Sequence, residues 1–172
     1  SAHSASYLIP LPWRHNLSLL GAYADTTAHF PNSSEGKGKS YQASARYSIP
    51  IRLSKNYLQE FTAGYDFKRL NNDFEFGGVT ESTRNVDVDQ FQLGYSGLLV
   101  DHWGQTSFGL EGYYSPGSLT SDNTDTAYND LRPGSQANYL YGRFTAERLT
   151  VLPYDFTYVI HFFGQLADQR LN

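Results

Sequence analysis

The chain has 172 residues, no cysteine and a formal net charge of −4 at pH 7. The lack of cysteine excludes a disulfide framework and a thiolate metal site. The acidic balance argues against a nucleic-acid partner, which would need a basic patch. No linker-like stretch divides the sequence, so residues 1–172 are expected to form a single domain.

The first expected strand covers residues 3–10, where Ala5, Tyr7 and Ile9 alternate with serine and leucine. Pro10 ends it, because proline donates no hydrogen bond to a sheet. A second strand is expected over residues 17–24. A polar loop rich in glycine, serine and asparagine follows over residues 29–39.

The third expected strand, residues 40–49, has the most regular alternation in the chain. Its aromatic and aliphatic residues occupy odd positions and its polar residues even ones, so its register is well specified. Residues 44–50 also repeat the pattern of residues 4–10. This 40-residue period indicates a repeated hairpin, because a propeller blade of that length would hold four short strands.

Strands are next expected at residues 61–68, 90–99 and 107–114, with a polar loop over 71–85 and a short turn at 101–104. The longest loop, residues 117–137, is polar and acidic. We expect it to lie outside a bilayer and to be dispensable for folding.

The last expected hairpin covers residues 138–168 and turns at residues 152–155. Its strands are about twice the usual five or six residues of a soluble strand. Strands this long, tightly turned at one end only, are typical of a barrel that crosses a bilayer.

Short and long connections alternate strictly along the chain, as in outer-membrane barrels. The predicted fold is therefore all-β: an antiparallel up-and-down transmembrane β-barrel of eight long strands. Aromatic residues make up 16% of the chain, and its 14 tyrosines suit membrane interfaces. Both termini fall on the long-loop side, so the chain is expected to be a segment of a larger barrel.

Alternation assigns each strand an apolar outer face and a polar inner face. The expected outer residues are Tyr41, Ala43, Tyr47, Phe61, Tyr65, Phe91, Leu93, Phe108, Leu110, Phe144, Phe156, Ile160 and Phe162. The expected lumen-lining residues are Ser44, Arg46, Asp66, Lys68, Gln90, Gln92, Glu111, Arg143, Glu147, His161 and Gln165. Charged side chains belong on the inner face, because Arg or Lys costs on the order of 2 to 4 kcal/mol at the midplane of the lipid face. A hydrated transport wall and a salt-bridge lattice that only stiffens the wall both remain open.

Four stretches of the sequence resemble the transporter barrels of two-partner secretion, the hemolysin-activator or filamentous-hemagglutinin-transporter type, which are relatives of the BamA barrel. The stretches are SASYLIPLPWRHNLSL, SARYSIPI, DQFQLGYSG and YGRFTAERLTVLPYDFTYVIHFFGQLADQRL. The resemblance lies in strand rhythm and short phrases over nearly the whole chain, and it includes no catalytic signature.

This resemblance implies a 16-stranded barrel in the bacterial cell outer membrane that exports one large exoprotein without ATP. Members of the family also carry periplasmic POTRA domains and an inward-folded lid loop with a Val-Arg-Gly-Tyr motif. Neither is expected within this sequence, which would then be about half of the pore wall. The implied partners are the lipid bilayer and a secreted exoprotein.

The sequence offers no catalytic, cofactor or metal signature, and we expect no enzyme activity. The five histidines form no close pair, and the recurring serines have strand spacing with no base in view. The run of residues 36–39 lacks the full phosphate-loop pattern. Asp122, Asp125 and Asp130 do not have the spacing of an EF-hand loop.

Two other functions remain open. One is a small closed eight-stranded outer-membrane barrel with a structural or adhesive role. The other is a soluble lipocalin-like binder, whose apolar face would surround a ligand. The first and last strands would leave unpaired backbone groups that hydrocarbon does not tolerate. We expect them to pair with each other, closing a narrow barrel, rather than with a second copy.

Overall fold

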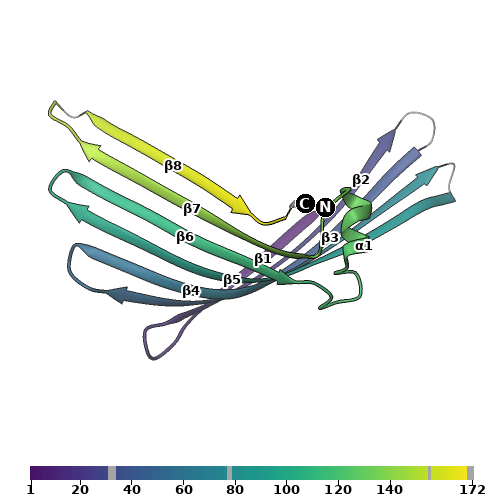
Figure 1. Cartoon of the computed structure of the whole chain (residues 1–172), viewed down its shortest axis with the longest axis horizontal. Helices are drawn as coiled ribbons and strands as arrows, with labels where there is room; N and C mark the ends of the chain where they lie inside the picture. Colours follow the sequence, from purple (N-terminus) through teal and green to yellow (C-terminus); the bar gives the residue numbers. More distant parts are fainter. Residues whose placement is uncertain (31–33, 77–78, 155, 170–172) are drawn as a thin grey trace.

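The computed structural model describes residues 1–30, 34–76, 79–154 and 156–169. It contains eight strands and one short helix (Figure 1). The elements are β1 (Ala2–Pro10), β2 (Asn16–Phe30), β3 (Ser34–Arg52), β4 (Tyr57–Phe76), β5 (Val79–Asp101), β6 (Gly104–Pro116), α1 (Asp125–Leu131), β7 (Asn138–Val151) and β8 (Thr157–Ala167). None of the described helices is long and apolar enough to cross a membrane.

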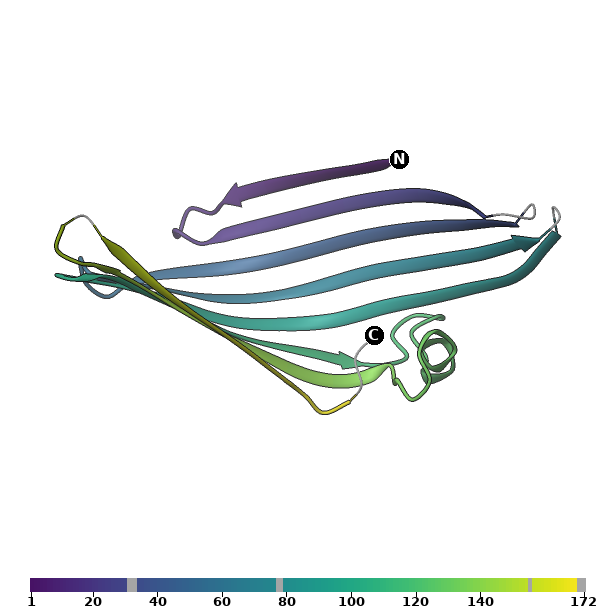
Figure 2. The same ribbon diagram turned by 90° about the horizontal axis from the view of Figure 1, so that it is seen from above.

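All eight strands belong to one antiparallel sheet in the order β1 to β8, so each strand pairs with its neighbours in sequence. The predicted all-β up-and-down arrangement of eight strands is confirmed. The sheet is twisted and curved, with β1 at one edge and β8 at the other (Figure 2). The turns that follow β1, β3, β5 and β7 gather at one end of the strands, and the long connection of residues 117–137 lies at the other end (Figure 1).

The sheet is open, which corrects the expectation that the first and last strands pair with each other. Each edge strand has a hydrogen-bonded neighbour on one side only: β2 for β1, and β7 for β8. Eight strands with this curvature span only part of a circumference. The chain therefore forms an open, curved sheet with two edge strands, consistent with a partial barrel.

Two of the three expected loops are largely strand. β2 and β3 remain paired from Asn16 to Phe30, and β4 and β5 pair out to Phe76 and Val79, across most of residues 29–39 and 71–85. Sequence alternation fades in these regions. The ladder continues because it needs only paired backbone groups and no alternation of side chains.

The third expected loop, residues 117–137, contains α1. Thr124 caps the helix by accepting a hydrogen bond from the backbone N–H of Ala127 at 3.3 Å. Tyr128 of α1 packs with Val86 and Val88 of β5 and with Tyr139 of β7. The segment thus folds back onto the sheet instead of extending freely from it. Whether it is dispensable for folding remains a prediction.

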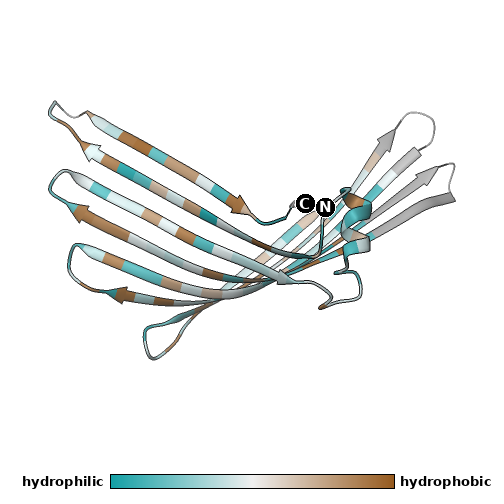
Figure 3. Ribbon diagram, in the orientation of Figure 1, coloured by the Kyte–Doolittle hydropathy of each residue, from teal (hydrophilic) through white to brown (hydrophobic). Residues whose placement is uncertain are grey.

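The strand register separates two faces, and hydropathy alternates along each strand (Figure 3). The expected outer residues share one face, as the cross-strand series Ala63–Leu93–Gly112–Gly142–Leu166 illustrates. Phe156 lies just before β8. Burial is inverted relative to a soluble protein, because Leu93 on the apolar face is 69% exposed and its neighbour Gln92 on the polar face only 4%. Side chains crowd on the polar face, which is therefore the concave one.

Candidate functional site

All of the expected lumen-lining residues lie on the concave polar face. Ser44, Asp66 and Gln90 form one row across β3, β4 and β5. Glu111, Arg143 and Gln165 form another across β6, β7 and β8. The rest occupy neighbouring rows of the same face, namely Arg46, Lys68, Gln92, Glu147 and His161. That this face borders an aqueous lumen remains a prediction.

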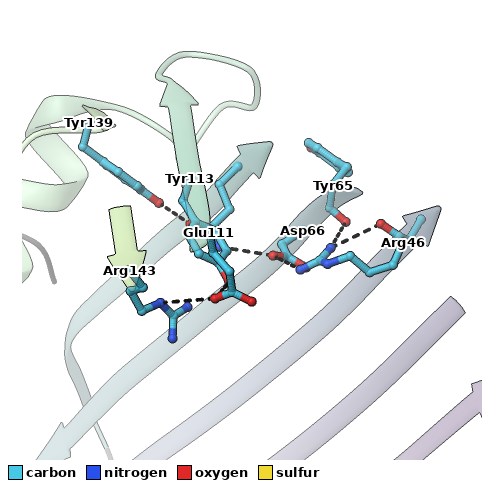
Figure 4. Close-up of polar contacts among 9 residues, drawn as sticks. Arg46, Tyr65, Asp66, Glu111, Tyr113, Tyr139 and Arg143 are labelled. Carbon is cyan, nitrogen blue, oxygen red and sulfur yellow. Dashed lines mark hydrogen bonds and ion pairs between the residues drawn. The ribbon is translucent and has the colours of Figure 1, made fainter. Parts of the chain in front are cut away.

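One polar chain crosses the middle of this face (Figure 4). The Arg46 guanidinium contacts the Asp66 carboxylate at 2.6 Å. The Gln90 side-chain amide donates to the same carboxylate at 3.2 Å, and its oxygen accepts from the Tyr139 hydroxyl at 3.0 Å. Each group therefore uses its neighbour to satisfy its polar atoms, as buried polar groups must.

A second polar cluster joins β6 and β7 (Figure 4). Glu111 and Arg143 are cross-strand partners whose charged atoms are 3.8 Å apart. The Tyr113 hydroxyl donates to Glu111 at 3.0 Å. The Tyr113 ring stacks on Tyr141 with centroids 4.6 Å apart, and the Arg143 guanidinium carbon lies 4.7 Å from the Tyr113 centroid. This cation–π arrangement fixes an otherwise flexible arginine against the wall.

Gly64 creates the space in which Arg46 lies across the sheet. A Cβ at Gly64 would lie 2.5 Å from Arg46 Cδ and 2.6 Å from the carbonyl oxygen of Ala45. Any side chain at this position would displace the arginine or the neighbouring strand. The ion pair to Asp66 therefore depends on a glycine one strand away.

Towards the short turns, the polar face forms a hollow of about 680 Å³. Its lining includes Glu60, Glu147, His161 and several small residues such as Ser96 and Ser107. Glu147 and His161 are cross-strand partners. Within the described residues, neither Glu147 nor His161 has a hydrogen bond or ion pair to another side chain. In the described part of the chain, this region of the polar face therefore has charged side chains that are not engaged in side-chain hydrogen bonds or ion pairs.

The sequence placed charged, amide and tyrosine residues on this face by parity, but the expected lumen-lining residues did not include the tyrosines that connect them, Tyr113 and Tyr139. Tyr113 and Tyr139 are only 6% and 5% exposed. Both occupy positions of polar-face parity: Tyr113 lies two residues after Glu111 on β6, and Tyr139 on β7 pairs with Ser115, two residues after Tyr113. Parity was the available signal, but an aromatic ring in a barrel sequence is most simply assigned to the lipid interface.

The α1 segment closes the edge of β5 beyond the end of β6. The ladder between β5 and β6 begins at Phe91 and Tyr114, which leaves Asp87 without a strand partner on that side. Its N–H donates instead to Asp122 O at 3.1 Å. Its carbonyl accepts from Asn123 Nδ2 at 2.9 Å and from the Tyr128 hydroxyl at 3.1 Å. Burial raises the pKa of the Tyr128 phenol well above its usual range.

The described residues contain no group of three or more His, Asp or Glu side chains that could hold a metal ion. The site is instead an extended polar wall, suited to transient hydrogen bonding. Comparisons of the chain with protein-family models, with curated proteins and with solved structures found no match.

Proposed function

We propose that this chain is about half of the pore wall of an outer-membrane transporter of the two-partner secretion type, which exports a large hemolysin- or adhesin-type exoprotein. The observation that carries the proposal is the inverted sheet. An open, curved meander of eight strands exposes its apolar side chains on the convex face and collects its polar ones in the trough. Lipid on the convex side and water in the trough would satisfy both faces.

Ion pairs lie at both ends of the apolar face. Near the end of the strands that carries α1, Arg69 contacts Asp87 at 2.6 Å. Near the short turns, Arg148 contacts Asp101 at 2.5 Å. Between these two ion pairs, β5 places no charged residue on this face from Phe91 to Leu99. Eight residue steps of about 3.3 Å, inclined by about 40°, rise about 20 Å along the bilayer normal, which is most of the apolar band of about 25 Å in such barrels.

The composition of the trough supports the passage of an extended polypeptide. Serine, glutamine, threonine and glycine offer weak and exchangeable hydrogen bonds, and its arginines are already held by Asp66 and Glu111. A moving chain would meet few strong partners. The free edges of β1 and β8 are where the remaining strands of the transporter would pair, because unpaired backbone groups are costly in lipid.

Neither alternative function is favoured by the structure. A lipocalin-like binder would turn its apolar face inward, whereas here residues such as Phe162 and Leu110 are 56% exposed. A closed eight-stranded barrel would require β1 to pair with β8, and these strands are the two edges of the sheet.

Membrane orientation is tested with single cysteines, since the chain has none of its own. Leu93→Cys lies on the apolar face and Ser96→Cys on the polar face, three residues away on the same strand. In vesicles, a water-soluble maleimide should label Ser96→Cys and leave Leu93→Cys unlabelled. The native Trp13 and Trp103, both in short turns, should be quenched most by lipids brominated near the headgroup. Equal labelling of the two cysteines would contradict a membrane wall.

The transport role is tested in bacteria that produce the full-length protein. A bulky maleimide adduct on Ser96→Cys should reduce the release of the exported protein into the medium. The same adduct on Ser118→Cys, an exposed position before α1, should not. If the Ser96 adduct leaves release unchanged, the chain is a membrane wall without a transport role.

A further inference from the structure

The apolar face contains a hollow of about 500 Å³ near its middle. Gly112 of β6 and Gly142 of β7 are directly opposite each other and form its floor. Leu93, Leu110 and Leu140 stand around it, with exposed fractions of 69%, 56% and 53%. Phe61 and Tyr95 complete its apolar rim.

Packing within the chain does not explain the two glycines. A Cβ at Gly112 would meet no atom within 4 Å, and one at Gly142 would meet only the Glu111 carbonyl oxygen, at 3.6 Å. Both are therefore unlike Gly64, where a side chain would collide with the neighbouring strand. Since glycine weakens a strand interior, two adjacent glycines without a packing reason mark a place where something else approaches the backbone.

The dimensions of the hollow restrict its occupant. Leu93 lies beside the glycine pair in the same cross-strand row, one strand spacing or about 5 Å from Gly112 between Cα atoms. Along the strands, Leu110 of β6 and Leu140 of β7 bracket the glycine pair at two residues on opposite sides, or about 13 Å in total. A helix is about 10–12 Å across with its side chains and much longer, so these walls would obstruct it. A flexible hydrocarbon chain would fit.

We propose that this hollow binds one acyl chain of a lipid in the surrounding bilayer. The inference rests on the proposed membrane location, because the hollow is continuous with the exposed apolar face. The glycine floor lets the chain approach the backbone of β6 and β7, and the leucines hold it from the sides. Recognition is of the hydrocarbon alone, since the lining side chains that project on this face are apolar apart from the Tyr95 hydroxyl.

The test compares lipid retention by the wild-type chain and by Gly112→Leu and Gly142→Leu, which fill the hollow. Gly21→Leu is the matched control: Gly21 is on the same face, and a Cβ there also meets nothing within 4 Å, but it does not line the hollow. Each protein is reconstituted in nanodiscs of palmitoyl-oleoyl phosphatidylethanolamine and released for native mass spectrometry. A parallel set uses phosphatidylglycerol with the same acyl chains.

The wild type and Gly21→Leu should retain one more lipid than either filled variant, in both lipid compositions. Equal retention by all four proteins would overturn the inference while leaving the membrane location intact. Retention that depends on the headgroup would also overturn it, because an acyl-chain site does not distinguish headgroups. Failure of the wild type to enter nanodiscs would instead contradict the proposed function.

Discussion

Tyr128 provides the sharpest test of whether the segment of residues 117–137 is a structural cap or a dispensable loop. Its side chain is 2% exposed, packs against Val86 and Tyr139, and donates a hydrogen bond to the Asp87 carbonyl. Tyr128→Ala removes a buried aromatic ring, which typically costs about 3–5 kcal/mol. Tyr128→Phe keeps the ring and loses one hydrogen bond, which costs about 1 kcal/mol.

Amide hydrogen exchange of α1, measured by mass spectrometry on the protein in detergent micelles, reports this cost directly. Each 1.4 kcal/mol corresponds to about tenfold in the opening equilibrium, so Tyr128→Ala should reduce protection at least about a hundredfold. Tyr128→Phe should reduce it less than about tenfold. Tyr154→Ala, at a position 92% exposed, is the control and should change nothing. Unchanged protection in Tyr128→Ala would refute the cap and support a free surface loop.

Three further predictions concern charge, space and pH. Arg69→Met leaves the 0% exposed Asp87 carboxylate unpaired and should lower the free energy of unfolding in urea by about 3 kcal/mol. Arg148→Met disrupts a more exposed ion pair and should lower it much less, so similar effects of the two variants would contradict the difference in burial. Gly64→Ala places a Cβ 2.6 Å from a carbonyl oxygen of β3 and should cost about 1–3 kcal/mol in the same assay, and a neutral result would mean that the strand yields. Because burial raises the pKa of Tyr128 in the folded protein, the contribution of Tyr128 to the packing of α1 on the sheet is complete below pH 10 and decreases above it. Limited proteolysis should therefore release α1 progressively above pH 10 in the wild type, with a weaker pH dependence in Tyr128→Phe.

The sequence by itself determined the number of strands, their order and their two faces. Alternation is a local property, and shifting a strand by one residue would transfer every side chain to the other face. Strand β3 shows this clearly, since Tyr41 to Ile49 keep one parity throughout and pair in that register with β2 and β4. The charged residues of the polar face followed from the same parity.

Only the tertiary structure decided how far the strands extend where alternation is weak, and which distant segments pack together. Alternation is weak in the sequence of residues 71–85, so no local signal separated this stretch from a loop, yet backbone pairing between β4 and β5 continues to Phe76 and Val79. The cap formed by α1 depends on where β6 leaves β5, which exposes the backbone of Asp87 to Asn123 and Tyr128.

Closure of the sheet is the property that lies furthest from the sequence. Whether β1 pairs with β8 depends on the total curvature of eight strands, which cannot be read from any single residue. The side chains of the two edge strands are as apolar on the outer face as those of the central strands, for example Tyr7 and Ile160. The sequence thus determined a sheet with an apolar face and a polar face. The tertiary structure determined that the edges of this sheet are open, because twist and curvature are set collectively by all the strands.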